Sequence, residues 1–247
     1  KNLFEYSDGL NKIPVLSGAS INTWSPSWSA PFGWIDTAIA ERHFMSKRKN
    51  QSQNKRSIYF NLNKTILEDV STLSFKRSRI AFRKIARRAD ARTIIPALIP
   101  PDHLTQDGLP VLVFKDNNAD FEAYVLGIFS SVIFDWQARR YVELNVLSRI
   151  ICNMSIPIFH NCVLAQRVIE ISGSMVLRDI RFKEWTARLG ISVEAARGSD
   201  KEMELLAELE AVVARLYGLD APDIKVIWDT FHTNVNHLPD LSKVLKY

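Results

Sequence analysis

The pattern of apolar residues changes at Asn118, and this change limits what the chain can fold into. Before it, tryptophans alternate with Pro, Ser and Gly in "PVLSGASINTWSPSWSAPFGWID", a composition typical of short strands and ordered loops. After it, apolar residues recur at helical spacing. We therefore expect an α+β protein, in which a mixed sheet with flanking helices is followed by a mainly helical C-terminal part.

Two segments are the clearest predicted helices. Asn118 is the expected N-cap of one, whose apolar stripe runs through Phe121, Val125, Ile128 and Val132. The other covers residues 199–216, with Ser199 and Glu202 in a capping-box pattern and Gly218 at the C-cap site. Its stripe consists of Leu206, Leu209, Val213 and Leu216. "APDIKVIWDTF" predicts a short final helix, and "VIEISGSMVL" leaves helix and strand open.

The segment between these two parts is predicted to contain strands. In "SRIAFRK", Ile80 and Phe82 alternate with the basic residues, which favours a strand with the arginines on the opposite face, although a helix competes. "TIIPALIP" predicts a strand that Pro96 confines to an edge or bulge. "LPVLVFKD" (residues 109–116) predicts another strand. Residues 42–56 are basic and lack apolar periodicity, so we expect an exposed loop there.

Charge is distributed unevenly along the chain. Residues 1–100 carry 17 Lys and Arg against 7 Asp and Glu, a net charge of +10, whereas residues 101–247 carry a net charge of −5. A basic part joined to an acidic part indicates a polyanionic partner for the basic part. Two alternatives stay open at this level, a solvated charged face and arginines paired with the acidic half. The N-terminal tryptophans are expected in the core, with base stacking as the alternative.

Sequence signals for catalysis are nearly absent. The five histidines are scattered, and His232 and His237 lack the spacing that places two metal ligands on one helix face. No G-x-S-x-G motif, phosphate-cradling glycine loop or dinucleotide fingerprint occurs. The two cysteines, Cys152 and Cys162, are expected as reduced thiols of a cytoplasmic protein, and no apolar run is long enough to span a membrane. We predict no catalytic and no metal-binding residue in this chain.

Several stretches in the same order resemble the C-terminal part of large adenine-N6 DNA methyltransferases of restriction–modification and phage-defence systems, including fused type II restriction–modification enzymes. They are "PVLSGASINTWSP", "RIAFRKIARRADARTIIPALIPP", "VLGIFSSVIFDWQARRYV" with a following "SIP", and "ELEAVVARLYGL". The matching positions are Arg79, Phe82, Arg83, Arg92, Thr93, Pro100 and Pro101, then Ser130, Ser131, Asp135, Arg139 and Pro157, and finally Ala214, Leu216, Tyr217 and Gly218.

The resemblance implies a target recognition domain, which holds duplex DNA and reads its sequence while a separate catalytic domain methylates the adenine. The catalytic (N/D/S)-P-P-(Y/F) motif, the S-adenosylmethionine loop and a nuclease constellation are missing from this sequence. We therefore expect a non-catalytic fragment, as the start at Lys1 also indicates. No cofactor is expected in this chain, whereas the parent enzyme would use S-adenosylmethionine and magnesium.

This reading divides the chain into a basic, β-rich DNA recognition domain (1–160) and a helical C-terminal region (161–247). The expected partners are double-stranded DNA and the methyltransferase catalytic domain of the same parent protein, with no membrane. The alternative is a protein–protein docking module with a basic surface and no DNA specificity. The residues expected to contact DNA are Arg79, Arg83, Arg87, Arg88, Arg92, Thr93, Lys47, Arg48 and Lys49.

Overall fold

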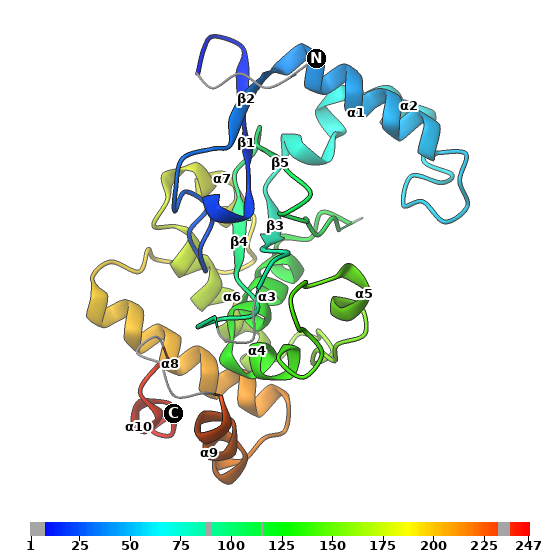
Figure 1. Cartoon of the computed structure of the whole chain (residues 1–247). Coiled ribbons are helices and arrows are strands. Elements are labelled where there is room, and N and C mark those ends of the chain that lie inside the picture. The colour runs from blue at the N-terminus through cyan, green and yellow to red at the C-terminus, as the bar shows by residue number, and fades with distance from the viewer. Residues whose placement is uncertain (1–7, 87–89, 115, 232–237) are drawn as a thin grey trace.

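The computed structural model describes residues 8–86, 90–114, 116–231 and 238–247 and confirms the predicted α+β class (Figure 1). The strands are β1 (Lys12–Leu16), β2 (Gly33–Asp36), β3 (Arg79–Phe82), β4 (Pro96–Ile99) and β5 (Leu104–Thr105). The helices are α1 (Thr37–Gln51), α2 (Lys64–Glu68), α3 (Ala119–Ser130), α4 (Val132–Ala138), α5 (Ser148–Ile151), α6 (Val163–Val176), α7 (Lys183–Thr186), α8 (Ser199–Leu216), α9 (Ala221–Thr230) and α10 (Leu241–Val244).

Two small sheets form the β part. In the first, β1 lies between β2 and β5, antiparallel to β2 and parallel to β5. The second pairs β3 with β4 antiparallel, with Arg79 opposite Ile99 and Phe82 opposite Pro96. Both strands of this pair were predicted, and Pro96 begins β4, where a residue without an N–H is tolerated.

Residues 109–116 do not form the predicted strand. Val111 makes an isolated bridge to Ala81, and Leu112 N donates to Ile80 O, so the segment runs beside β3 without continuing as a strand. Residue 115 is outside the described residues. The alternating apolar pattern therefore indicated a segment that packs along the edge of β3. It did not indicate how many of its residues pair with β3 as a strand.

The predicted loop at residues 42–56 is wrong for most of its length, because α1 continues to Gln51. Asp36 caps this helix by accepting a hydrogen bond from Ile39 N at 3.0 Å. Its buried face contains Ala40, Phe44 and Arg48, which stand four residues apart and pack beside Leu73 and Phe75. The periodicity was hidden because one member of the stripe is an arginine.

The helical part packs around α3, which is buried along almost its whole length. Helix α6 lies against α3 and against α8, and the ambiguous "VIEISGSMVL" segment is helical as part of α6 (Figure 1). Gly127 of α3 allows the close approach of α6, since a Cβ there would lie 2.5 Å from Val168 Cγ1. The main hydrophobic cluster includes residues from both sides of position 160, from Trp24 to Val244.

The predicted ends of the later helices are mostly confirmed. Asn118 caps α3 by accepting from Phe121 N at 3.0 Å, but the predicted stripe is broken at Ser131, which caps α4, so Val132 belongs to α4. The helix predicted at residues 221–231 is α9, although α10 and not α9 is the final helix. The capping box proposed for Ser199 is wrong, because Gly198 is the N-cap of α8 and makes no side-chain cap bond. Gly218 follows the C-cap with a φ of +73°, which glycine adopts without strain.

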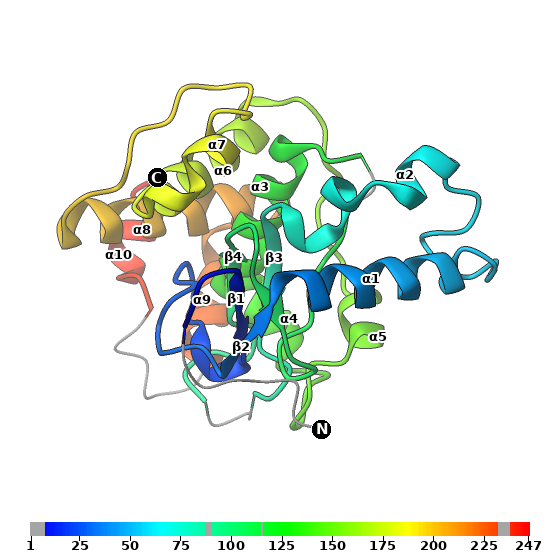
Figure 2. The ribbon, with the colours of Figure 1, turned by 90° about the horizontal axis from the view of Figure 1, so that it is seen from above.

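Helices α1 and α2 project together from the end of the molecule that holds β1 and β2, on the side away from α8, α9 and α10 (Figures 1 and 2). We call residues 37–68 the basic arm. Its residues 42–67 contain seven Lys and Arg and no Asp or Glu.

Candidate nucleic-acid interface

A cleft of about 750 Å³ separates the basic arm from β5 and residues 106–113. We call it the basic cleft. Its lining includes four cationic side chains, Lys47, Arg48, Arg56 and Arg79. Asp107 also lines it, but Lys84 neutralises this carboxylate through an ion pair with Nζ and Oδ2 2.5 Å apart. The walls therefore carry a surplus of positive charge.

Arg48 forms part of the floor of the cleft and is buried. Its guanidinium donates to Thr72 Oγ1 at 2.8 Å and to the carbonyl oxygens of Leu67 at 2.9 Å and Asp69 at 2.8 Å. Burial lowers the pKa of Arg48, while Tyr59 and Asp69 act in the opposite direction. These bonds hold the turn after α2 onto α1, so Arg48 fixes the shape of the arm and leaves its charge beside the cleft.

Arg79 occupies the opposite wall and is only 5% exposed. Its guanidinium donates to His103 O, and burial lowers the pKa of Arg79 to about 10, so the side chain is still protonated near neutral pH. All four residues of β3 are buried, so its arginine-bearing face is covered as well. Arg79 thus contributes to the electric field of the cleft and offers little surface for direct contact.

Six cations of the arm are exposed: Arg42, Lys47, Lys49, Lys55, Arg56 and Lys64. Lys47 and Arg56 line the basic cleft, whereas Lys49 does not. Arg56 and Tyr59 were not among the predicted contacts. The sequence could have indicated Arg56, because this residue ends the same basic stretch. It gave no indication of Tyr59, because only the fold of the arm brings that residue to the cleft.

Arg83 and Arg92 line a different cleft, of about 840 Å³. Arg83 is half-buried, and its Nε donates to Ile21 O at 3.0 Å. Two of the three cations that line this cleft are paired with acids: Arg92 with Asp135, and Arg178 with Glu202, whose atoms Nη1 and Oε2 are 2.5 Å apart. Four carboxylates line the same cleft: Asp90, Asp179, Glu202 and Glu210. This second cleft is therefore close to charge-balanced, unlike the basic cleft.

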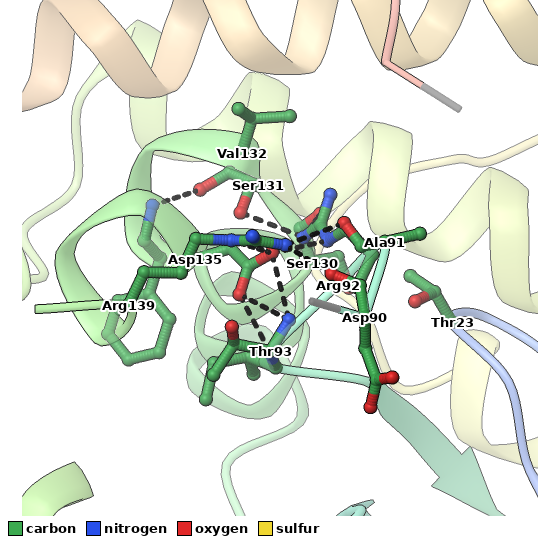
Figure 3. A network of polar contacts seen from close by, with 12 residues as sticks. Thr23, Asp90, Ala91, Arg92, Thr93, Ser130, Ser131, Val132, Asp135 and Arg139 are labelled. Carbon is green, nitrogen blue, oxygen red and sulfur yellow. Dashed lines mark hydrogen bonds and ion pairs between the residues drawn. The ribbon is translucent and has the colours of Figure 1, made fainter. Parts of the chain in front are cut away.

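Arg92 and Thr93 belong to a buried polar network (Figure 3). Arg92 Nε lies 3.0 Å from Asp135 Oδ2, and its Nη2 donates to the carbonyl oxygens of Ser130 at 2.8 Å and Ser131 at 2.9 Å. The backbone N–H of Thr93 donates to Asp135 Oδ1 at 2.9 Å. The arginine thus satisfies carbonyls at the end of α3 and a carboxylate of α4 at once.

Arg139 completes this network from the other side. Its Nη2 donates to the carbonyl oxygens of Asp90 and Ala91, each at 2.8 Å (Figure 3). Its guanidinium stacks 4.3 Å from the ring centroid of Phe231. Asp135 has no exposed side-chain surface, and burial raises its pKa against the opposing effect of Arg92. The network therefore joins residues 90–94, the α3–α4 junction and the C-terminal helices.

Six positions that carry the family resemblance meet in this network, and its members are Arg92, Thr93, Ser130, Ser131, Asp135 and Arg139. These six positions therefore contribute to the packing of the interior. Arg87 and Arg88 are outside the described residues. The predicted contact residues are consequently divided: Lys47, Arg48 and Arg79 line the basic cleft, and Arg83 and Arg92 line the second cleft.

Within the described part of the chain, no three His, Cys, Asp or Glu side chains come together as a metal site. Over the same residues, the helices are too short or too polar to cross a bilayer. Both cysteines are free.

No protein-family model and no curated protein matches this sequence. A solved structure of the type IIL restriction–modification enzyme MmeI in complex with DNA is similar to the chain, with a TM-score of 0.44 and 12% sequence identity. The similarity covers 90% of this chain and 30% of that enzyme chain, so this chain spans less than a third of the enzyme's length. The similarity is distant, and the function has to be inferred from the residues of this chain.

Proposed function

We propose that the chain binds double-stranded DNA through the basic cleft and recognises a sequence in it. The observation that carries this proposal is the surplus of positive charge in that cleft, where four cations face an Asp107 that Lys84 already neutralises. Duplex DNA presents closely spaced phosphates, and several Lys and Arg on one surface are the usual means of holding it.

Among the exposed cations of the arm, Lys47, Lys49 and Arg56 are the proposed direct phosphate contacts. Buried Arg48 and Arg79 strengthen the field behind them without direct contact. Such sequence-independent contacts position a protein on the duplex, and base contacts then supply specificity. Arg83, half-buried in the neighbouring cleft, keeps a proposed role as a reader of bases, since arginine pairs well with guanine in the major groove.

In the biological setting that we propose, the chain is the target recognition region of a restriction–modification or phage-defence adenine-N6 DNA methyltransferase. The catalytic domain, which would use S-adenosylmethionine, lies outside this chain. Part of the sequence resemblance falls on the buried network, which supports a shared architecture for the region and leaves the basic cleft as the DNA-contacting surface.

A binding-site selection on a pool of randomised duplexes tests this function. We expect one sequence class to be enriched and to bind more than tenfold tighter than a scrambled duplex in fluorescence anisotropy at fixed salt. Equal affinity for all duplexes, or none, would contradict sequence-specific recognition. Salt dependence alone does not separate DNA binding from docking to an acidic protein, because both weaken with salt.

A further inference from the structure

A third cleft, of about 510 Å³, is lined by Pro14 and Leu16 of β1 and by Trp34 of β2. His103, which lines it, directly precedes Leu104 and Thr105, which line the basic cleft. We call it the aromatic cleft, since two indole rings, Trp28 and Trp34, form much of its wall together with His103 and Arg181. No Asp or Glu occurs among the described residues that line it. Its volume is in the range of small-molecule sites.

Trp28 is unusual among the tryptophans because 63% of its surface is exposed, whereas Trp24 is 7% exposed and belongs to the core. Rigid loops that hold an aromatic ring in solvent are typical of binding surfaces, because a large ring contributes contact area at little conformational cost. The exposure of Trp28 thus points to a ligand.

The loop that carries Trp28 is fixed on both sides. Trp28 N donates to Ser20 O at 2.9 Å, and the neighbouring Ser29 Oγ donates to Ala19 O at 2.8 Å. Arg181 Nη2 donates to Ser27 Oγ at 2.7 Å from the helical part of the protein. Trp24 adopts a φ of +63°, a conformation that non-glycine residues keep only when their surroundings enforce it. The backbone that carries Trp28 is therefore held in place.

The polar groups of the aromatic cleft fit a flat, polar-edged ligand attached to an anion. Burial lowers the pKa of His103, so its ring is neutral near pH 7. Its Nδ1, 2.8 Å from Pro101 O, must carry the proton because a carbonyl only accepts, which leaves Nε2 as an acceptor. Behind His103 lies the cationic Arg79, which donates to its carbonyl oxygen. A nucleobase combines a stackable face with donors and acceptors at its edge.

We propose that the aromatic cleft holds one unstacked nucleobase of the nucleic acid bound in the basic cleft, with Trp28 stacking on its face. This inference rests on the proposed DNA binding, since the chain passes directly from His103 of the aromatic cleft to Leu104 and Thr105 of the basic cleft. The alternative ligand class for a cleft of indoles and prolines is a proline-rich peptide. Asp179 neutralises Arg181, with Nη2 and Oδ2 2.5 Å apart, so the charge of this cleft does not decide between the two ligands. The His103 acceptor and the basic cleft that begins at the next residue favour the nucleobase.

Two duplexes of identical sequence test the inference, one fully paired and one with a single unpaired thymidine that needs no energy for extrusion. In fluorescence anisotropy we expect the bulged duplex to bind more tightly. Trp28→Ala should weaken its binding about 5- to 100-fold, the range that stacking of one base on an aromatic ring corresponds to, and leave the paired duplex unchanged. Trp28→Phe should retain most of the preference, and Tyr141→Ala, a change at an equally exposed ring outside the cleft, should have no effect.

Equal affinity of the native protein for the two duplexes, or a preference that survives Trp28→Ala, overturns the inference while the proposed DNA binding stands. If neither duplex binds, the proposed function fails. Binding of a single-stranded thymidine 10-mer then tests separately whether the aromatic cleft binds a nucleobase. Binding of the 10-mer that is lost in Trp28→Ala supports the cleft, and no binding overturns it. A proline-rich peptide that binds in a Trp28-dependent manner and is not displaced by the 10-mer also overturns it.

Discussion

Arg92 and Asp135 form a buried ion pair, with Nε and Oδ2 3.0 Å apart, although they come from a loop after β3 and from helix α4. The pair holds Arg92 in the interior, although this arginine belongs to the most basic segment of the chain. The side chain of Arg92 is therefore bound within the interior. In the function that we propose, DNA contact is made by exposed cations of the arm.

Breaking this ion pair should destabilise the folded protein. We expect Arg92→Ala to lower the free energy of unfolding by about 3–5 kcal/mol, because Asp135 would be left charged and buried without its closest cation. Urea denaturation followed by circular dichroism measures the change. The matched control is Lys84→Ala, whose partner Asp107 is 92% exposed, and it should cost less than about 1 kcal/mol. Equal effects of the two variants would show that the buried network is dispensable.

Removing the exposed cations of the basic cleft should weaken DNA binding without unfolding the chain. For the double variant Lys47→Ala/Arg56→Ala, we expect weaker binding to every duplex sequence and a salt slope reduced by about one unit for each lost phosphate contact. Anisotropy titrations at several salt concentrations measure both quantities. Lys225→Ala on α9, exposed and outside the basic cleft, is the control. An unchanged salt slope would show that Lys47 and Arg56 do not contact the phosphates.

Stability should fall as the pH rises through the range in which Glu210 titrates. Its carboxylate accepts from Val132 N at 2.8 and 3.0 Å, but burial prevails and raises its pKa from 4.5 to about 7. The folded state therefore keeps a proton that the unfolded chain loses between about pH 4.5 and 7. The free energy of unfolding should decrease across that window by on the order of 3 kcal/mol.

The variant Glu210→Gln isolates this contribution, since its amide oxygen still accepts from Val132 N while the titration is removed. Thermal unfolding between pH 4.5 and 7.5 should show a smaller decrease for this variant than for the native chain. Part of the decrease should remain, because burial also raises the pKa of Asp135. If the variant showed the same pH profile as the native chain, the pH dependence of stability would come from groups other than Glu210.

The contact between α3 and α6 should not tolerate an added methyl group. In Gly127→Ala, the new Cβ would lie 2.5 Å from Val168 Cγ1 and 2.6 Å from Ser172 Oγ, so the helices must shift. We expect a loss of about 1–3 kcal/mol in the free energy of unfolding. Gly108→Ala, whose Cβ would meet nothing within 4 Å, is the control and should be close to neutral. Equal stabilities would mean that the α3–α6 contact can adjust freely.

Elements with a local signal were predicted well. Helix α3 follows from its N-cap and apolar stripe, α8 follows from its stripe, and β3 and β4 follow from alternation and from Pro96 at an edge. Helix α1 was missed because its buried stripe includes Arg48, whose partners at Leu67 and Asp69 become available only after the chain has turned back. A polar residue on a buried face cannot be recognised from periodicity alone.

The sequence by itself determined the fold class, the positions of α3 and α8 and the basic character of the first hundred residues, because capping, periodicity and composition act over a few neighbouring residues. Only the tertiary structure decided how each arginine is used. A buried guanidinium needs an acid or several carbonyls around it, and Arg92 finds them at Asp135 and at the end of α3. Lys47 and Arg56 stay exposed because α1 and the segment after it project beside β5.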